Sequence, residues 1–161
     1  LPRQSMILVI GANGGQGMHV VDQLLERGFR VRCTVRNAEK AISTGKYFEE
    51  KYGVGRYMPV VIPDMVHKGA FDLAIRGCSG VVHSASVMTY STDPHEVVSP
   101  TIAGVLNALE SAGKESGVKR FVCCSAPAAT VSDTLGTINE VTGESWDIAA
   151  FEKAWNTAPP Y

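Results

Sequence analysis

Short, nearly all-apolar runs recur along this chain. They are MILVI at residues 6–10, VRCTV at 31–35, YMPVVI at 57–62, GVVHSA at 80–85 and RFVCCS at 120–125. Strands that are apolar without alternation are buried on both faces, which is typical of a parallel sheet covered by helices. The sequence therefore predicts a sheet of parallel strands in the interior of the molecule.

Segments with helical periodicity separate these runs. The predicted helices span residues 20–28, 38–52, 70–76 and 102–112. Gly28 is a typical C-terminal cap, Pro100 interrupts the fourth helix near its start, and Val105, Leu106 and Leu109 share one side of that helix. Alternating strands and helices with right-handed crossovers predict an α/β fold with a doubly wound parallel sheet, which is Rossmann-like.

The character of the chain changes after the last run. Residues 126–161 contain many turn formers, and we expect an irregular, loop-rich tail with one short helix at 147–155. We interpret residues 6–161 as one domain, and residues 1–5 as an addition ahead of a natural start at Met6.

Length and charge exclude several classes of function. The 161 residues are 45% hydrophobic, which suffices for one compact domain. The net charge is -1 and no basic block stands out, which argues against nucleic acid as a partner. No apolar run approaches the roughly 20 residues of a membrane span, and no signal peptide is recognisable. We therefore expect a cytoplasmic protein that does not enter a membrane.

The cysteines show no metal-binding pattern. Cys33, Cys78, Cys123 and Cys124 form no CxxC pair, and the adjacent Cys123 and Cys124 would point to opposite faces of a strand. We expect all four to be small core residues in a reducing compartment, and we expect no metal site.

A glycine-rich loop, GANGGQG, follows the first predicted strand and precedes the first helix. In dinucleotide-binding folds the first glycine makes a tight turn, the second lets the pyrophosphate approach, and the third allows the helix to pack on the strand. Gly11, Gly14 and Gly17 match these roles in a GxxGxxG spacing. The alternative is a flexible turn that only connects strand and helix.

The end of the second predicted strand bears on the choice of nucleotide. NAD-binding proteins tend to place an acidic residue there for the ribose 2′-hydroxyl, whereas an arginine accommodates a 2′-phosphate. The sequence is TVRNAEK, with Arg36 at this place and Lys40 one helical turn later. NADP(H) is therefore favoured over NAD(H), unless both are merely solvated charges.

These motifs resemble the extended short-chain dehydrogenase/reductase superfamily. Within it they are most similar to dihydroflavonol reductases, cinnamoyl-CoA reductases and fungal NADPH-dependent aldehyde and ketone reductases. The motifs are GANGGQG, TVRNAEK, PDMVHKGAFDLAIRGCSGVVHSAS, DPHEVVSPTIAGVLNALESA, VKRFVCCS and GESWDIAAFEKAW. They span nearly the whole chain in the family's order.

The resemblance implies roles for individual residues along the cofactor. The pyrophosphate would be lined by Asn13, Gly14, Gly15 and Gln16, and Arg36 and Lys40 would meet the 2′-phosphate. The adenine would be flanked by Asp64 and Met65. The ribose on the nicotinamide side would lie beside Ser84, Ala85 and Ser86. His83, at an inward position of its strand, is interpreted as structural, and Asp64 without the resemblance is a turn former after Pro63.

The resemblance also implies catalytic groups that this chain only partly provides. In these enzymes a serine holds the substrate carbonyl, and a YxxxK pair supplies the proton, with the lysine lowering the pKa of the tyrosine. No YxxxK follows the fifth predicted strand, and Ala126 stands where the serine is expected. Ser125, one residue earlier, and Tyr161, the last residue, are the remaining catalytic candidates. The GGQG of the loop resembles NmrA-like proteins, NADP-binding regulators that lack the catalytic tyrosine.

Two functions therefore stay open. One is an NADPH-dependent reductase of a small aldehyde or ketone, or its cofactor-binding part. The other is a degenerate relative that binds NADP(H) without redox turnover, as a sensor or partner, or that uses the pocket for isomerisation or dehydration. The resemblance also implies a C-terminal substrate-binding portion, which this chain lacks. We therefore expect an exposed apolar surface, which a homo-oligomer would cover.

Overall fold

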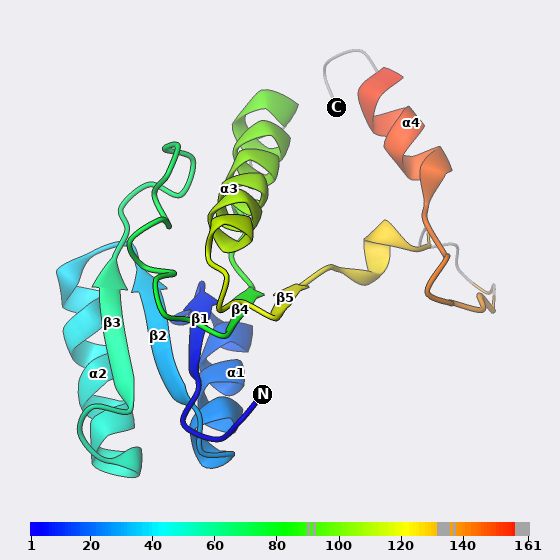
Figure 1. The fold of residues 1–161 in the computed structure, drawn as a ribbon. Coiled ribbons are helices and arrows are strands. Elements are labelled where there is room, and N and C mark those ends of the chain that lie inside the picture. Colours follow the sequence, from blue (N-terminus) through cyan, green and yellow to red (C-terminus); the bar gives the residue numbers. More distant parts are fainter. Residues whose placement is uncertain (90, 92, 132–135, 137, 157–161) are drawn as a thin grey trace. The chain divides into compact units, whose positions relative to one another are not determined.

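The predicted strands form one parallel sheet (Figure 1). They are β1 (Met6–Ile10), β2 (Arg30–Val35), β3 (Tyr57–Val61), β4 (Gly80–His83) and β5 (Arg120–Cys123). The structure, a computed structural model, describes all residues except 90, 92, 132–135, 137 and 157–161. It divides into two units, Leu1–Cys124 and Ser125–Tyr161, which are described separately.

The strand order is β3-β2-β1-β4-β5. The chain starts in the middle at β1, moves outward to β3, and then returns to the other side of β1 as β4. In such open sheets ligands bind beyond the carboxyl ends of the strands, where the order reverses. In this chain that place lies between the ends of β1 and β4, which are paired from Ile7 and Gly80 to Ile10 and His83.

Helices cover both faces of the sheet. They are α1 (Gly15–Glu26), α2 (Ala38–Tyr52) and α3 (Pro94–Lys114). Successive residues of β1 point to opposite faces: Ile7 and Val9 belong to the core shared with α1 and α2, and Leu8 and Ile10 to the core shared with α3. Burial on both faces explains why this strand is apolar throughout, and it confirms the doubly wound α/β class.

The prediction of a helix at residues 70–76 is wrong. This segment is a series of turns between two glycines with positive φ, Gly69 at +78° and Gly77 at +70°. Its last carbonyls are not held by a continuing helix but by Arg32 of β2, whose Nη1 donates to the oxygens of Ala74 (2.7 Å) and Arg76 (2.8 Å). Phe71, Ala74 and Ile75 of the segment are nevertheless buried, whereas Leu73 is exposed, so most of the expected packing is present without the expected helix.

Helix α3 begins earlier than its sequence indicates. It starts at Pro94, with Asp93 as N-cap accepting from the His95 N–H, and it runs through Pro100. Proline at this position removes the hydrogen bond to Glu96, and because Glu96 is exposed its carbonyl can turn to water. The helix interior therefore tolerates a proline that the sequence suggests as a boundary.

The buried side of α3 is made of small and polar residues. These are Gly104, Asn107, Ala108, Ser111 and Ala112. The larger apolar residues Ile102, Leu106 and Leu109 are exposed, as is Val122 on the edge strand β5. The exposed apolar surface that we expected is therefore present, whereas its coverage by a second copy stays a prediction.

The cysteines divide into two groups, all with free thiols. Cys33 and Cys78 are buried in the two cores as expected. Cys123 and Cys124 are exposed, so the expectation of a core position is wrong for them. The reason is their place at the end of β5 and directly after it, since β5 has β4 as its one paired neighbour in the described sheet.

The second unit contains little regular structure. A short 3-10 turn spans Pro127–Ala129, and helix α4 spans Ile148–Asn156, close to the predicted range. The N–H of Asp147 donates to the Ala129 carbonyl at 3.0 Å, which joins the two elements. Thr142 and Ser145 bond each other in the turn between them.

Candidate functional site

The first glycine of GANGGQG lies where the ends of β1 and β4 meet. Gly11 has φ +84°, a backbone conformation that residues with a side chain rarely adopt. A Cβ on Gly11 would also lie 2.8 Å from the backbone nitrogen of Ala85, which follows β4. The loop therefore passes directly over the point where the strand order reverses.

The remaining glycines differ in what surrounds them. A Cβ on Gly17 would lie 2.0 Å from the Gly11 carbonyl oxygen, so Gly17 is required for the helix to pack on the loop. A Cβ on Gly14 would meet the same oxygen at 3.4 Å, an ordinary contact, and one on Gly15 would meet nothing within 4 Å. The protein's own packing therefore does not explain glycine at 14 and 15, but a ligand close to the backbone would.

The start of α1 is suited to an anion. Its N-cap is Gly14, which offers no side-chain acceptor, and the first turn contains no acidic residue. The first helical N–H to be bonded within the helix is that of Met18, to the Gly14 oxygen at 3.0 Å. The N–H groups that precede it have no partner within the helix, and together with the partial positive charge of the helix terminus they suit an anion. Asn13 is half-buried beside them and Gln16 is exposed.

The predicted basic pair lies at the end of the neighbouring strand. Arg36 directly follows β2, and Lys40 is in the first turn of α2; both side chains are exposed. Asn37 between them caps the helix by accepting from the Lys40 N–H at 3.0 Å. Sequence reasoning overlooked this cap, although an asparagine ahead of a helical segment is a standard signal for one. The cap fixes the start of α2 and with it the positions of Arg36 and Lys40.

The loop after β3 contains the predicted adenine residues. The Asp64 carboxylate accepts from the Val66 N–H at 2.8 Å, a local turn that agrees with its interpretation as a turn former. The Met65 side chain instead packs against the core below α3. The loop is bonded to Asn107 of α3, a residue that sequence reasoning missed because a polar residue inside a helix carries no distinctive pattern.

The segment after β4 is held to β1. The backbone N–H and the Oγ of Ser84 both donate to the Ile10 carbonyl, each at 2.9 Å. Ala85 lies against Gly11, and Ser86 is exposed. His83 is 1% exposed on the α3 side of the sheet, and burial lowers its pKa, with the carbonyls of His83 and Gly104 acting in the opposite direction. Its buried, neutral imidazole agrees with a structural role.

Neither of the two catalytic candidates belongs to the first unit, which contains the glycine-rich loop. Ser125 is exposed and begins the second unit. Tyr161 lies outside the described residues. The structure therefore groups the predicted cofactor residues of the first unit and leaves the catalytic pair a prediction.

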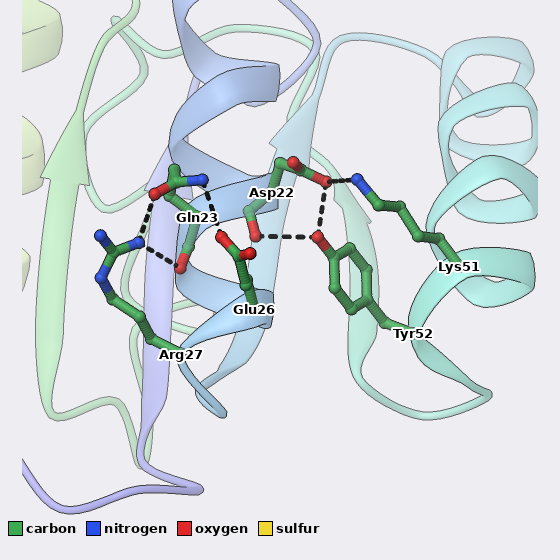
Figure 2. Close-up of polar contacts among 6 residues, drawn as sticks. All are labelled: Asp22, Gln23, Glu26, Arg27, Lys51 and Tyr52. Carbon is green, nitrogen blue, oxygen red and sulfur yellow. Dashed lines mark hydrogen bonds and ion pairs between the residues drawn. The ribbon is translucent and has the colours of Figure 1, made fainter.

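A tyrosine and a lysine do meet elsewhere, between α1 and α2 (Figure 2). The Asp22 carboxylate accepts from Lys51 and from the Tyr52 hydroxyl, both at 2.7 Å. Burial and the Asp22 carboxylate raise the pKa of Tyr52, the opposite of what a proton donor at neutral pH needs. Asp22 also lies about 10 Å along α1 from Gly15. This cluster joins two helices and does not serve the glycine loop.

Comparison with known proteins agrees with this geometry. Residues 11–154 match the sequence family described as NAD(P)H-binding. The chain belongs to this family. The NAD(P)H-binding region begins at Gly11, at the loop derived above, and includes all the predicted cofactor residues.

The most similar proteins include carbonyl reductases. This NAD(P)H-binding chain is 44% identical over 159 residues to Aldehyde reductase 2 of Sporidiobolus salmonicolor, covering 96% of this chain and 45% of that protein. It is 38% identical over 127 residues to Dihydroflavonol 4-reductase of Solanum lycopersicum, covering 78% of this chain and 33% of that protein.

A solved structure shows the same relationship. The yeast methylglyoxal/isovaleraldehyde reductase Gre2, complexed with NADPH, superposes with a TM-score of 0.72 and 30% identity over 79% of this chain and 39% of that chain. The similarity to the fungal reductase and dihydroflavonol reductase branch is confirmed. The chain spans less than half the length of these relatives.

Two other expectations concern features outside the loop. No helix in the part of the chain that the structure describes is long and apolar enough to cross a membrane. Among the same residues no group of three His, Cys, Asp or Glu side chains is placed to hold a metal ion. Neither finding identifies a further site.

Proposed function

We propose that this chain is the NADPH-binding part of a reductase that acts on small aldehydes or ketones. The observation that carries the proposal is the start of α1, where a Cβ on Gly15 would meet nothing within 4 Å and one on Gly14 would make only an ordinary contact, so the packing does not require either glycine. The N–H groups of the first turn, which have no partner within the helix, would donate to a pyrophosphate at this place. The named relatives, reductases of aldehydes and of dihydroflavonol, support the substrate class.

The preference for NADPH over NADH rests on Arg36 and Lys40. Among the residues that the structure describes, the ion pairs join Lys51 to Asp22 and Lys114 to Asp72, so neither Arg36 nor Lys40 is paired with an acidic side chain. The guanidinium of Arg36 can donate two parallel hydrogen bonds to a phosphate, and Lys40 adds a second positive charge. The proposed ligand of the pair is the 2′-phosphate, which NADH lacks.

The other residues of the first unit would orient the dinucleotide. Asn13 and Gln16 would flank the pyrophosphate, Asp64 and Met65 the adenine, and the segment from Ser84 to Ser86 the second ribose. When bound, the reduced nicotinamide supplies a hydride to the carbonyl carbon of the substrate. The proposed groups for the carbonyl oxygen are Ser125, which would donate a hydrogen bond, and Tyr161, which would donate the proton.

Further proposals concern the cellular compartment and the partners of the protein. The exposed thiols of Cys123 and Cys124 fit a reducing compartment, and we propose the cytoplasm. The proposed partner is a small carbonyl compound. A second copy of the chain is a further proposed partner, because Ile102, Leu106 and Leu109 present an exposed apolar stripe on α3.

The experiment that tests the proposal compares NADPH and NADH binding in charge variants. Arg36→Ala should weaken NADPH on the order of tenfold or more, because a charge-assisted hydrogen bond contributes about 1.5–3 kcal/mol. The same variant should leave the weaker NADH affinity nearly unchanged. Lys46→Ala is the matched control, since it removes one positive charge from an exposed position farther along α2.

The outcomes separate the proposal from its alternatives. Equal losses for NADPH and NADH in Arg36→Ala would show that the arginine does not contact the 2′-phosphate. Equal losses in Arg36→Ala and Lys46→Ala would show a general effect of charge. A chain that binds NADPH and never reduces a carbonyl compound, even with its downstream sequence supplied, would be the non-redox relative.

A further inference from the structure

Asn107 of α3 is buried and uses its whole amide group on one loop. Its Oδ1 accepts from the Gly69 N–H at 2.9 Å. Its Nδ2 donates to the Met65 carbonyl at 3.0 Å and to the His67 carbonyl. The side chain is 7% exposed, so these bonds are shielded from water. One amide thus satisfies three backbone groups in the loop that follows β3.

Gly104 lies one turn earlier on the same side of α3 and leaves room for a side chain of the same loop. A Cβ on Gly104 would lie 2.9 Å from both the Cγ and the Sδ of Met65. The Met65 side chain therefore occupies the space that the glycine leaves. Helix α3 fixes Met65 twice, through its carbonyl at Asn107 and through its side chain at Gly104.

This loop lies at the carboxyl edge of the sheet beside the proposed 2′-phosphate residues. Strand β3 pairs with β2 up to Val61 and Val35, so Asp64 and Arg36 both follow paired strand ends. Asp64 adds its own turn by accepting from the Val66 N–H. A short loop of this kind has few contacts of its own, and its position depends on the helix to which it is bonded.

We propose that Asn107 is a positioning residue for the adenine side of the nucleotide site. By holding the carbonyls of Met65 and His67 and the N–H of Gly69, it keeps Asp64 and Met65 where an adenosine would lie. It acts through the loop and not by touching the nucleotide. This inference rests on the proposed function, because it assumes that the loop after β3 contacts the cofactor.

The test uses Asn107→Asp with adenosine 2′,5′-bisphosphate as the probe of the adenine side. Aspartate keeps the shape and the acceptor for Gly69 but replaces the amide donor by an oxygen facing two carbonyls. Affinity for adenosine 2′,5′-bisphosphate and for NADPH should fall by the same factor, on the order of tenfold. Repulsion between this oxygen and the two carbonyls should push the loop away from residue 107, so exchange of the Gly69 amide hydrogen should become faster, which can be measured without any nucleotide.

Two variants make the result specific. Ser111→Ala is the control, because Ser111 is buried one turn later on α3 and donates to Asp72, which lies beyond the loop groups that Asn107 holds. It should lower stability without changing nucleotide affinity. Gly104→Ala disturbs Met65 by contact and should reproduce the loss seen in Asn107→Asp, which keeps the inference testable if that variant folds poorly.

Each outcome has a distinct meaning. If the unmodified chain binds and Asn107→Asp and Gly104→Ala bind equally well, the positioning role is contradicted and the proposed function stands. Unchanged exchange at Gly69 in Asn107→Asp would also contradict the positioning role. If the unmodified chain binds neither NADPH nor adenosine 2′,5′-bisphosphate, the proposed function fails and the inference fails with it.

Discussion

The carbonyl oxygen of Gly11 lies where a side chain on Gly17 would have to be. A Cβ on Gly17 would approach that oxygen to 2.0 Å and the Ala12 Cα to 3.0 Å, and both atoms belong to the backbone. Gly17 is buried, and the turn at Gly11 depends on a positive φ. The first and third glycines of the loop therefore fit each other, independently of any ligand.

This relationship separates two substitutions in the same loop. Gly17→Ala should lower the free energy of unfolding by about 3 kcal/mol or more, since neither backbone atom can move easily. Gly15→Ala should leave thermal stability unchanged or slightly higher, because nothing lies within 4 Å of the added methyl group. It should nevertheless weaken NADPH binding, which calorimetry would measure. Normal NADPH affinity in Gly15→Ala would mean that the open space does not hold the pyrophosphate.

Arg32 should stabilise the turns that replace the predicted helix at 70–76. Its guanidinium is bonded to the carbonyls of Ala74 and Arg76, so Arg32→Met should destabilise the protein by about 2 kcal/mol in urea unfolding. Arg30→Met, on the same strand, is the control, because Arg30 is exposed and its guanidinium approaches the Met58 sulfur at 3.9 Å. Equal effects of the two substitutions would count against this role of Arg32.

His83 should make stability depend on pH. Burial holds its pKa below the ordinary value of 6.5, so below about pH 6.5 the unfolded chain binds the proton more readily than the folded chain. Its contribution to stability is therefore complete above that pH and is lost as the pH falls toward the folded pKa. Urea unfolding at pH 7.5 and 5.5 should show a smaller decrease for His83→Gln than for the unmodified chain. Equal decreases would mean that His83 does not titrate in this way.

The cysteines should react in two classes. Cys123 and Cys124 are exposed and should react rapidly with a thiol reagent in the folded protein. Burial raises the pKa of Cys33 to about 12 and also raises the pKa of Cys78, so both thiols should react only after unfolding. Counting modified thiols by mass spectrometry with and without denaturant measures this directly. Four equal rates would contradict the burial of Cys33 and Cys78.

The sheet and the glycine loop could be predicted because their signals are local. Uninterrupted apolar runs mark buried parallel strands, and glycines between a strand and a helix mark a close turn. The segment at 70–76 could not be assigned in the same way, because its buried residues fit one turn of helix as well as successive tight turns. The difference depends on Arg32, a residue far away in the sequence that satisfies the carbonyls.

The details of α3 depend equally on distant contacts. Its sheet side consists of small residues because Met65 and the loop after β3 occupy the space beside Gly104. The pattern of large apolar residues along the helix predicts instead that Leu106 and Leu109 lie on the buried side, but both are exposed. Asn107 is recognisable only from its three bonds to the loop, since nothing in its neighbourhood along the chain distinguishes it.

The most direct test of the central claim is a calorimetric titration of the unmodified 161-residue chain with NADPH and with NADH at one salt concentration. We expect that NADPH binds and that NADH binds at least tenfold more weakly, because the 2′-phosphate that Arg36 and Lys40 would contact is present only in NADPH. Equal affinities would contradict the role of the basic pair. Absence of binding by either nucleotide would contradict the claim that the open space at Gly14 and Gly15 holds a pyrophosphate.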